Sequence, residues 1–218
     1  MGRPRADGGP LAPERLETAF FDLLRTTDYR DISVSAVVRA AGLNRNSFYY
    51  HYTDLDDLAR SAADAVLLTD VAHLIAGGLT PDSPQVDRLV VQGIASDRVA
   101  RILILLGPHS TAPLRGIVRS AVQDVWLAEF GLEHTDLEEA ESATLGFVLG
   151  GFMATVARLS PGERTGEDNS GGSGRAAGAH DLIERIRELR ALPIVEECAR
   201  ILMRTLRAAA DRKQGGAS

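Results

Sequence analysis

Cysteine and long apolar runs are scarce in this sequence, and each scarcity excludes a class of protein. Cys198 is the single cysteine among 218 residues, so neither an intrachain disulfide nor an all-cysteine metal site can form. No apolar run approaches the roughly 20 residues needed to cross a bilayer. Residues 1–10 also lack the apolar stretch of a secretory signal. We therefore expect a cytoplasmic protein with no membrane partner.

Lysine is also scarce, and acidic residues outnumber basic ones. The formal net charge is −6 and Lys213 is the only lysine, so nearly all cationic side chains are arginine. A chain of this charge is not expected to coat nucleic acid non-specifically, but cations gathered on one surface would still bind DNA. Arginine suits guanine edges and phosphates, although genomic composition explains the bias more simply.

What the sequence does contain is helical periodicity. Apolar residues recur every three to four positions along most of the chain, and no alternating strand pattern persists. We predict an all-α protein, with an N-terminal three-helix helix-turn-helix domain and a C-terminal helical bundle. The helices are expected at about 13–27, 34–41, 44–52, 54–76, 86–94, 102–106, 114–126, 136–158, 181–190 and 193–211.

The same pattern suggests how the chain is organised. We expect a flexible arm over residues 1–10, the helix-turn-helix domain over 11–53, a second domain over 54–213 and a disordered tail over 214–218. Residues 161–179 are rich in glycine, serine and charge, which predicts a flexible loop. Thr135 and Glu138 have the spacing of a capping box for the helix that follows them.

Two short helices joined by a glycine turn form the outline of a DNA-binding helix-turn-helix. Val34–Ala41 is the supporting helix, Gly42 and Leu43 form the turn, and Asn44–Tyr52 is the recognition helix. Ser33 and Asn44 are the expected N-caps of these two helices. Phe48 and Tyr52 are four residues apart and are expected to face the core. The remaining surface would then offer base- and phosphate-binding groups from Arg45, Asn46, Tyr49 and Tyr50.

The segment from Tyr29 to Leu58 resembles the N-terminal signature of the TetR family of transcription regulators. The matching residues are Tyr29, Ser33-Val34, Ala41-Gly42, Phe48-Tyr49-Tyr50-His51-Tyr52 and Asp54. The resemblance implies a repressor that binds a palindromic DNA operator as a homodimer and is released by a small-molecule effector.

It also implies roles for individual residues. Ser33, Tyr49 and His51 match phosphate-contacting positions. Asn44, Arg45 and Ser47 match positions that contact bases or backbone, and Tyr50 matches a variable specificity position.

Two positions depart from the family pattern. Asn46 replaces a usual glycine and offers a further base contact, and Leu55 replaces a usual lysine, which predicts that DNA binding depends less steeply on salt. Asp54, Asp56 and Asp57 are expected to cap the next helix rather than touch phosphate. Arg3 and Arg5 form either a minor-groove arm or a disordered tail.

For the C-terminal half, the resemblance implies a dimer interface and a ligand cavity. We expect helices of about 136–158 and 193–211 to form the interface, with Gly146, Gly150 and Gly151 allowing close approach either between subunits or inside one subunit. Polar or aromatic residues on the middle helices are the candidate ligand contacts: His73, Gln92, Arg101, His109, Arg119, Gln123 and Trp126.

Two other functions compete with this interpretation. An enzyme is not favoured, because the sequence has no catalytic triad order, phosphate loop or zinc spacing, and its five histidines are scattered. We therefore expect no catalytic residues, no metal and no cofactor. The second alternative is a helical ligand-binding or interaction module whose DNA reader is idle, which the missing lysine and the acidic flank would favour.

Overall fold

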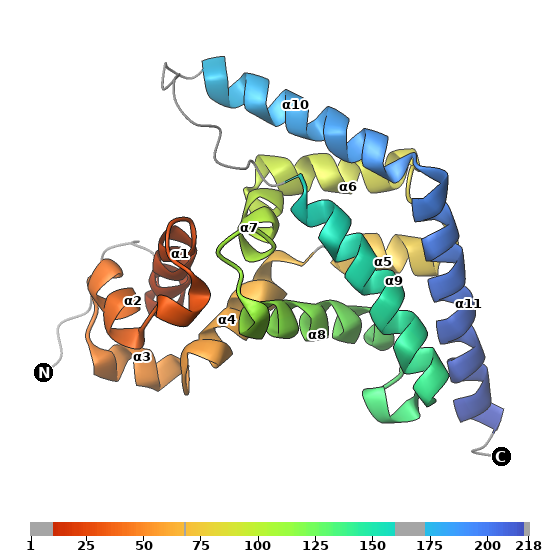
Figure 1. The fold of residues 1–218 in the computed structure, drawn as a ribbon, viewed down its shortest axis with the longest axis horizontal. Helices are drawn as coiled ribbons and strands as arrows, with labels where there is room; N and C mark the ends of the chain where they lie inside the picture. The colour runs from red at the N-terminus through yellow and green to blue at the C-terminus, as the bar shows by residue number, and fades with distance from the viewer. Residues whose placement is uncertain (1–10, 68, 160–172, 216–218) are drawn as a thin grey trace, which may run out of the picture.

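The computed structural model describes residues 11–67, 69–159 and 173–215, and of residues 173–179 it describes the backbone only. These residues form α-helices and two short 3-10 helices (η), with no strand among them. The fold is therefore all-α, as predicted. In chain order the elements are α1 Ala12–Leu24, η1 Tyr29–Asp31, α2 Val34–Ala40, α3 Arg45–His51, α4 Leu55–Val66, α5 Thr69–Ala76, α6 Pro84–Ala95, α7 Arg98–Leu105, α8 Ala112–Glu129, η2 His134–Asp136, α9 Glu139–Ala157, α10 Ser173–Arg190 and α11 Pro193–Gly215 (Figure 1).

Helices α1, α2 and α3 form the predicted helix-turn-helix unit at one end of the molecule (Figure 1). Their shared interior contains Leu16, Phe20, Val37 and Phe48, none of which is exposed. Burying four large apolar side chains stabilises so small a unit by about 1.5–3 kcal/mol each. The orientation of α3 is therefore set by its buried face.

This first core does not end with the helix-turn-helix unit. The same cluster of buried side chains continues through Leu58 and Ala62 of α4 to Leu105 of α7 and to Leu114 and Val118 of α8. The N-terminal unit is consequently packed directly against three helices of the second half.

A second core lies at the opposite end of the molecule, where α9 and α11 pack side by side (Figure 1). Leu145 and Leu149 of α9 meet Leu202 and Leu206 of α11 there, and all four side chains are buried. Residues of α5, α6 and α8 complete this cluster. Helix α10 lies along α6 and precedes α11 (Figure 1).

The single long helix predicted from Asp54 to about residue 76 is in fact two helices. Helix α4 ends at Val66, Leu67 has an extended backbone with ψ of 137°, and α5 begins at Thr69. Arg98 Nη2 donates a hydrogen bond to the Leu67 carbonyl oxygen, which gives the interrupted helix end a partner. The buried face of α4 runs through Leu58, Ala59, Ala62, Ala63 and Val66, whereas Ala65 is exposed.

The predicted capping box of Thr135 and Glu138 is wrong. Thr135 lies inside η2, and α9 begins one residue after Glu138. The backbone N–H of Glu138 donates to Glu141 Oε2 at 2.9 Å, so the helix start is stabilised three residues further along the chain. The N–H of Glu133 is bonded in the same way to Asp136 Oδ2, at 2.7 Å.

Parts of two segments that were predicted to be flexible are helical. Helix α10 begins at Ser173, so residues 173–179 are helical, as the alanines in this stretch favour. The rest of the predicted loop lies outside the described residues. Helix α11 continues to Gly215, two residues into the predicted tail, whose last three residues also lie outside the described part.

Helix α9 has a more apolar surface than the sequence pattern predicted. Phe152 is 41% exposed and Phe147 is 82% exposed. By length and composition alone, Glu139–Ala157 is able to cross a membrane, contrary to the expectation that no apolar stretch reaches that length, and little of it is buried. Its buried residues belong to the second core together with residues of α11, whereas these two phenylalanines are not part of that cluster.

Candidate nucleic-acid interface

Helix α3, the predicted recognition helix, is fixed at its start by a side-chain cap. Asn44 Oδ1 accepts hydrogen bonds from the backbone N–H of Ser47 at 2.9 Å and from Ser47 Oγ at 3.2 Å. Asparagine in an extended conformation is a favoured cap because it satisfies an orphan N–H of the first turn. Asn44 and Ser47 were predicted to contact DNA, and in the free protein they bond to each other.

The buried face of α3 is aromatic. Phe48 is completely buried, and its ring lies 5.7 Å from the ring of Tyr52, which is 7% exposed. The Tyr52 hydroxyl donates to Glu17 Oε1 of α1 at 3.2 Å, and Ser61 Oγ of α4 donates to the same oxygen. These contacts confirm the inward orientation predicted for Phe48 and Tyr52.

The opposite face of α3 points into solvent. Arg45, Asn46, Tyr49, Tyr50 and His51 are all exposed, with Tyr49 at 54% and Tyr50 at 84%. Among the described residues, Arg45 and Asn46 have no side-chain hydrogen bond or ion pair. The Tyr50 and His51 rings meet edge to face at 4.9 Å, and this contact limits their freedom. The helix therefore presents five polar side chains that have no hydrogen-bond partner among the described residues, although the Tyr49 ring also packs edge to face on Phe48.

Ser33 extends this surface to the start of α2. Its Oγ accepts from the Ala36 N–H at 3.2 Å, so the serine caps the helix as predicted. The residue is exposed, and a hydroxyl that accepts one bond still has its own proton to donate. Arg3 and Arg5 lie outside the described residues.

Arg15 is a contributor to this unit that the sequence pattern did not reveal. Its Nη2 donates to the carbonyl oxygen of Ala41 at 2.6 Å and to that of Gly42 at 3.2 Å. Gly42 has φ of +62°, a conformation that disfavours any side chain. Arg15 thus ties α1 to the turn between α2 and α3. It lies 27 residues before Gly42, and no local motif marks it.

The acidic residues that follow α3 form hydrogen bonds within the protein. Asp54 Oδ1 accepts from the Asp57 N–H at 2.8 Å, and Asp57 Oδ2 accepts from the Thr53 N–H at 2.8 Å, so both stabilise the start of α4. Asp56 instead accepts a hydrogen bond from the buried hydroxyl of Tyr29. Burial and the nearby Asp56 carboxylate raise the pKa of Tyr29 well above its ordinary value. The tyrosine therefore remains a neutral donor that joins η1 to α4.

The predicted ligand contacts do not gather in one place. His109 Nδ1 lies 3.0 Å from Asp28 Oδ1, and Arg101 lies over the Phe21 ring at 4.9 Å, so both join the N-terminal unit to the second half. On α8, Arg119 is exposed, Gln123 is half-buried and Trp126 packs against the second core.

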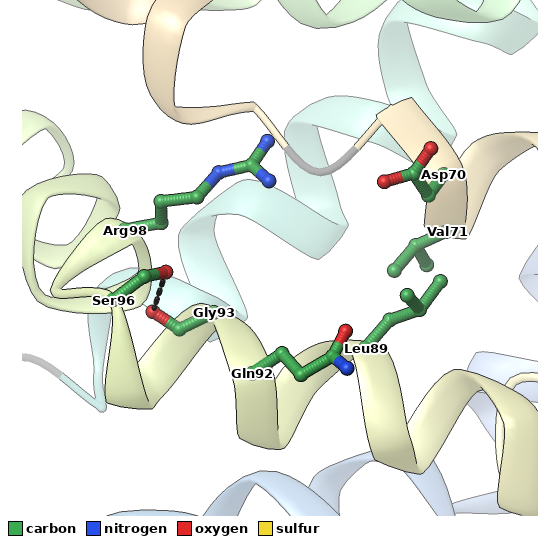
Figure 2. A pocket seen from close by; sticks show the side chains of 7 residues that line it. All are labelled: Asp70, Val71, Leu89, Gln92, Gly93, Ser96 and Arg98. Atoms are coloured by element: carbon green, nitrogen blue, oxygen red, sulfur yellow. Dashed lines mark hydrogen bonds between the residues drawn. The ribbon is translucent and has the colours of Figure 1, made fainter.

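Of the predicted set, His73 and Gln92 line the two hollows that lie beside α5 and α6 in the described part of the chain. One pocket, of about 160 Å³, lies between α5, α6 and the start of α7 and includes Gln92 (Figure 2). An adjoining, more open groove of about 470 Å³ includes both Gln92 and His73. Sequence reasoning missed the charged residues of these hollows, Asp70, Arg88 and Arg98, since the break between α4 and α5 that shapes the region has no sequence signal.

No group of three or more His, Cys, Asp or Glu side chains arranged to hold a metal ion occurs in the described parts of the chain.

Comparison with known proteins gives little further information. No family model matches the chain, and no curated protein matches it. Among solved structures, a TetR transcriptional regulator from Streptococcus agalactiae 2603V is similar over 85% of this chain and 93% of its own, with 18% sequence identity and a TM-score of 0.42. A similarity this low does not assign a function.

Proposed function

We propose that this protein is a DNA-binding transcription regulator of the TetR type and that α3 is its recognition helix. The observation that carries the proposal is the division of α3 into two faces. Phe48 locks one face into the core, and the other presents Arg45, Asn46, Tyr49, Tyr50 and His51 to solvent. A rigid helix that displays unused donors on one side suits the major groove of B-DNA.

The side chains divide naturally between reading and positioning. Arg45, in the first turn of α3, would bond a guanine edge, and Asn46 beside it would bond an adenine edge. Tyr49, His51 and the hydroxyl of Ser33 would contact phosphates, which fix the register but carry no sequence information. Tyr50, the most exposed of the aromatic residues, would modulate base preference.

The active form in this proposal is a homodimer formed through α9 and α11. Phe147 and Phe152 leave a substantial apolar surface on α9 that no described residue of the same subunit covers. Gly146, Gly150 and Gly151 have open space where a side chain would begin, so no described residue of the same subunit packs closely against them there. A second copy would cover this face and bring two readers onto a palindromic site.

The remaining parts of the proposal follow from the resemblance to the TetR family. Residues 11–53 would form the DNA-binding domain and residues 54–213 the regulatory domain. The protein would act as a cytoplasmic repressor that a small-molecule effector releases from its operator. Arg3 and Arg5 would add minor-groove contacts next to each recognition helix.

Selection of binding sites from a random pool of DNA duplexes tests the proposal even though the operator sequence is unknown. We expect enrichment of a palindrome whose half-sites lie about one helical turn, or a multiple of it, apart. The selection should be run at low and at physiological salt, because phosphate contacts weaken with added salt. If a folded dimer enriches no sequence even at low salt, the DNA reader is idle and the alternative function, a ligand-binding module, replaces this one.

A further inference from the structure

The pocket between α5, α6 and α7 is lined by two side chains of opposite charge that do not pair with each other. Figure 2 shows the Arg98 guanidinium and the Asp70 carboxylate pointing toward one another from opposite sides of the pocket. Asp70 is exposed and has no hydrogen-bond or ion-pair partner among the described residues. Arg98 Nη2 donates a hydrogen bond to the Leu67 carbonyl oxygen, while the Arg98 Nε is buried and has no acceptor.

The rest of the pocket lining is part apolar and part polar. Val71 and Leu89 form an apolar wall beside Asp70, and Gln92 lies on the floor, where its amide can both donate and accept (Figure 2). The volume of about 160 Å³ is below the roughly 300–1,000 Å³ of sites for drug-sized ligands. A ligand held within this pocket alone, without entering the adjoining groove, is therefore small, with a short apolar part.

We propose that this pocket binds a small zwitterion with the chemistry of an apolar α-amino acid. Its carboxylate would bind the Arg98 guanidinium, its ammonium group would bind Asp70, and its side chain would lie against Val71 and Leu89. A simple anion would be repelled by Asp70 and a simple cation by Arg98, whereas a molecule carrying both charges satisfies each. The carboxylate also offers acceptors to a guanidinium that has a buried, unpartnered nitrogen.

Occupancy of the pocket also has a route to the DNA reader. The Arg98 guanidinium already bonds the carbonyl of Leu67, where α4 ends. A carboxylate that draws the guanidinium into the pocket competes with that bond, and α4 holds the N-terminal unit through Asp56 and Tyr29. This second step rests on the proposed function, because it makes the zwitterion the effector that changes DNA binding.

Isothermal titration calorimetry on the full-length protein without DNA tests the pocket itself. The probes are L-valine, L-leucine and L-phenylalanine, together with 3-methylbutylamine and 4-methylpentanoate, which are leucine without its carboxylate and leucine without its amine. We expect at least one of the amino acids to bind, and we expect both single-charge analogues to bind at least tenfold more weakly than leucine. Equal binding of an analogue, or no binding of any amino acid at millimolar concentration, overturns the proposal.

Two variants locate the binding. Asp70→Asn should weaken amino-acid binding at least tenfold without affecting folding, because Asp70 has no partner in the described protein. Asp82→Asn is the matched control: Asp82 is exposed in the connection between α5 and α6 and lines neither hollow, so binding should be unchanged. Unchanged binding in Asp70→Asn overturns the assignment.

A DNA-binding arm separates the two proposals. Adding the amino acid that binds should change the affinity for the selected duplex at least tenfold in the wild type but not in Asp70→Asn. A protein that binds the amino acid but no duplex supports the pocket and refutes the proposed regulator. A protein that binds duplex but no amino acid supports the regulator and refutes the pocket.

Discussion

Arg15 and Arg45 belong to the same N-terminal unit, and their surroundings give them opposite tasks. The guanidinium of Arg15 is bonded to the carbonyls of Ala41 and Gly42, so it serves the fold. Arg45 is exposed and bonds to nothing in the described chain, so its donors remain available for a partner. At this scale, function follows from which polar groups the fold has left unused.

Arg45→Ala should relax the base preference of the protein. If the guanidinium bonds both acceptors of a guanine, its loss costs about 1–3 kcal/mol for that base pair. Binding-site selection measures the change as lost information at one position of each half-site.

Arg158→Ala, at the exposed end of α9, is the control and should leave the selected sequence unchanged. Retained preference at every position in Arg45→Ala would show that this arginine does not read bases.

Residue-scale predictions from sequence succeeded where the contact is local. Ser33 and Asn44 cap their helices through bonds to residues three positions ahead, a spacing that is visible in the sequence. The bonds of Arg15 to the turn and of His109 to Asp28 join residues 26 to 81 positions apart. Such pairings depend on how the helices pack, which periodicity alone does not determine.

At the scale of elements, the turn between α2 and α3 depends on a glycine and on the arginine above it. Gly42 has φ of +62°, and a Cβ built on it would lie 3.0 Å from Arg15 Nη2. An alanine here would strain the backbone and displace the side chain that holds the turn.

Gly42→Ala should lower the free energy of unfolding by about 1–2 kcal/mol, the cost of a left-handed conformation for a residue with a side chain. Urea denaturation followed by circular dichroism measures the change.

Gly116→Ala supplies the comparison, since Gly116 lies within α8 with open space around its Cβ position. That substitution should raise stability by about 0.5–1 kcal/mol. Equal effects of the two substitutions would contradict the role assigned to the turn.

Element boundaries were harder to predict than the elements themselves. The break after α4 leaves no mark in the sequence, because Val66 and Leu67 continue an apolar pattern that suits a helix. It is accompanied by a hydrogen bond from Arg98, 31 residues further along the chain. The start of α9 was misplaced because this stretch contains two similar acidic caps. Asp136 accepts a hydrogen bond from the Glu133 N–H, and Glu141 accepts one from the Glu138 N–H, and only the second lies at the start of α9.

The whole molecule is joined across its middle by η1 and the loop before α8. The backbone N–H of Tyr29 donates to the His109 carbonyl at 3.0 Å, and the His109 ring bonds to the Asp28 carboxylate. The hydrogen bond from His109, with a further one from Arg30, lowers the pKa of Asp28 below its ordinary value of 3.8.

Asp28 should therefore contribute to stability at neutral pH and lose that contribution in acid. Because its folded pKa is lowered, the contribution is complete above about pH 4 and disappears as the pH falls through the folded pKa. Asp28→Asn should accordingly be less stable than the wild type at pH 6, and the difference should shrink toward about pH 2.

Urea midpoints across this pH range give the comparison. Asp82→Asn should parallel the wild type, since Asp82 is exposed and has no partner among the described residues. A gap between Asp28→Asn and wild type that stays constant with pH would contradict the expectation.

Phe147→Arg should convert the proposed dimer to a monomer. The side chain is 82% exposed on α9, so replacing it leaves the subunit core intact while placing a charge in the apolar interface. Light scattering after size exclusion measures the mass.

Val91→Arg on α6, where the side chain is 36% exposed, is the control and should remain dimeric. A Phe147→Arg protein that is still dimeric would place the interface elsewhere.

The shared core of the first half has a consequence for engineering. Leu58 and Ala62 of α4 are fully buried in the same cluster as Phe20 and Phe48. A chimera joined at residue 53 would separate Phe20 and Phe48 from the α4 side chains that pack against them, and would expose apolar side chains on both fragments. A better junction for exchanging N-terminal units between proteins is Leu67, where α4 has already ended. The transferred unit must still have apolar side chains that pack against α7 and α8, because both helices contribute to the same core.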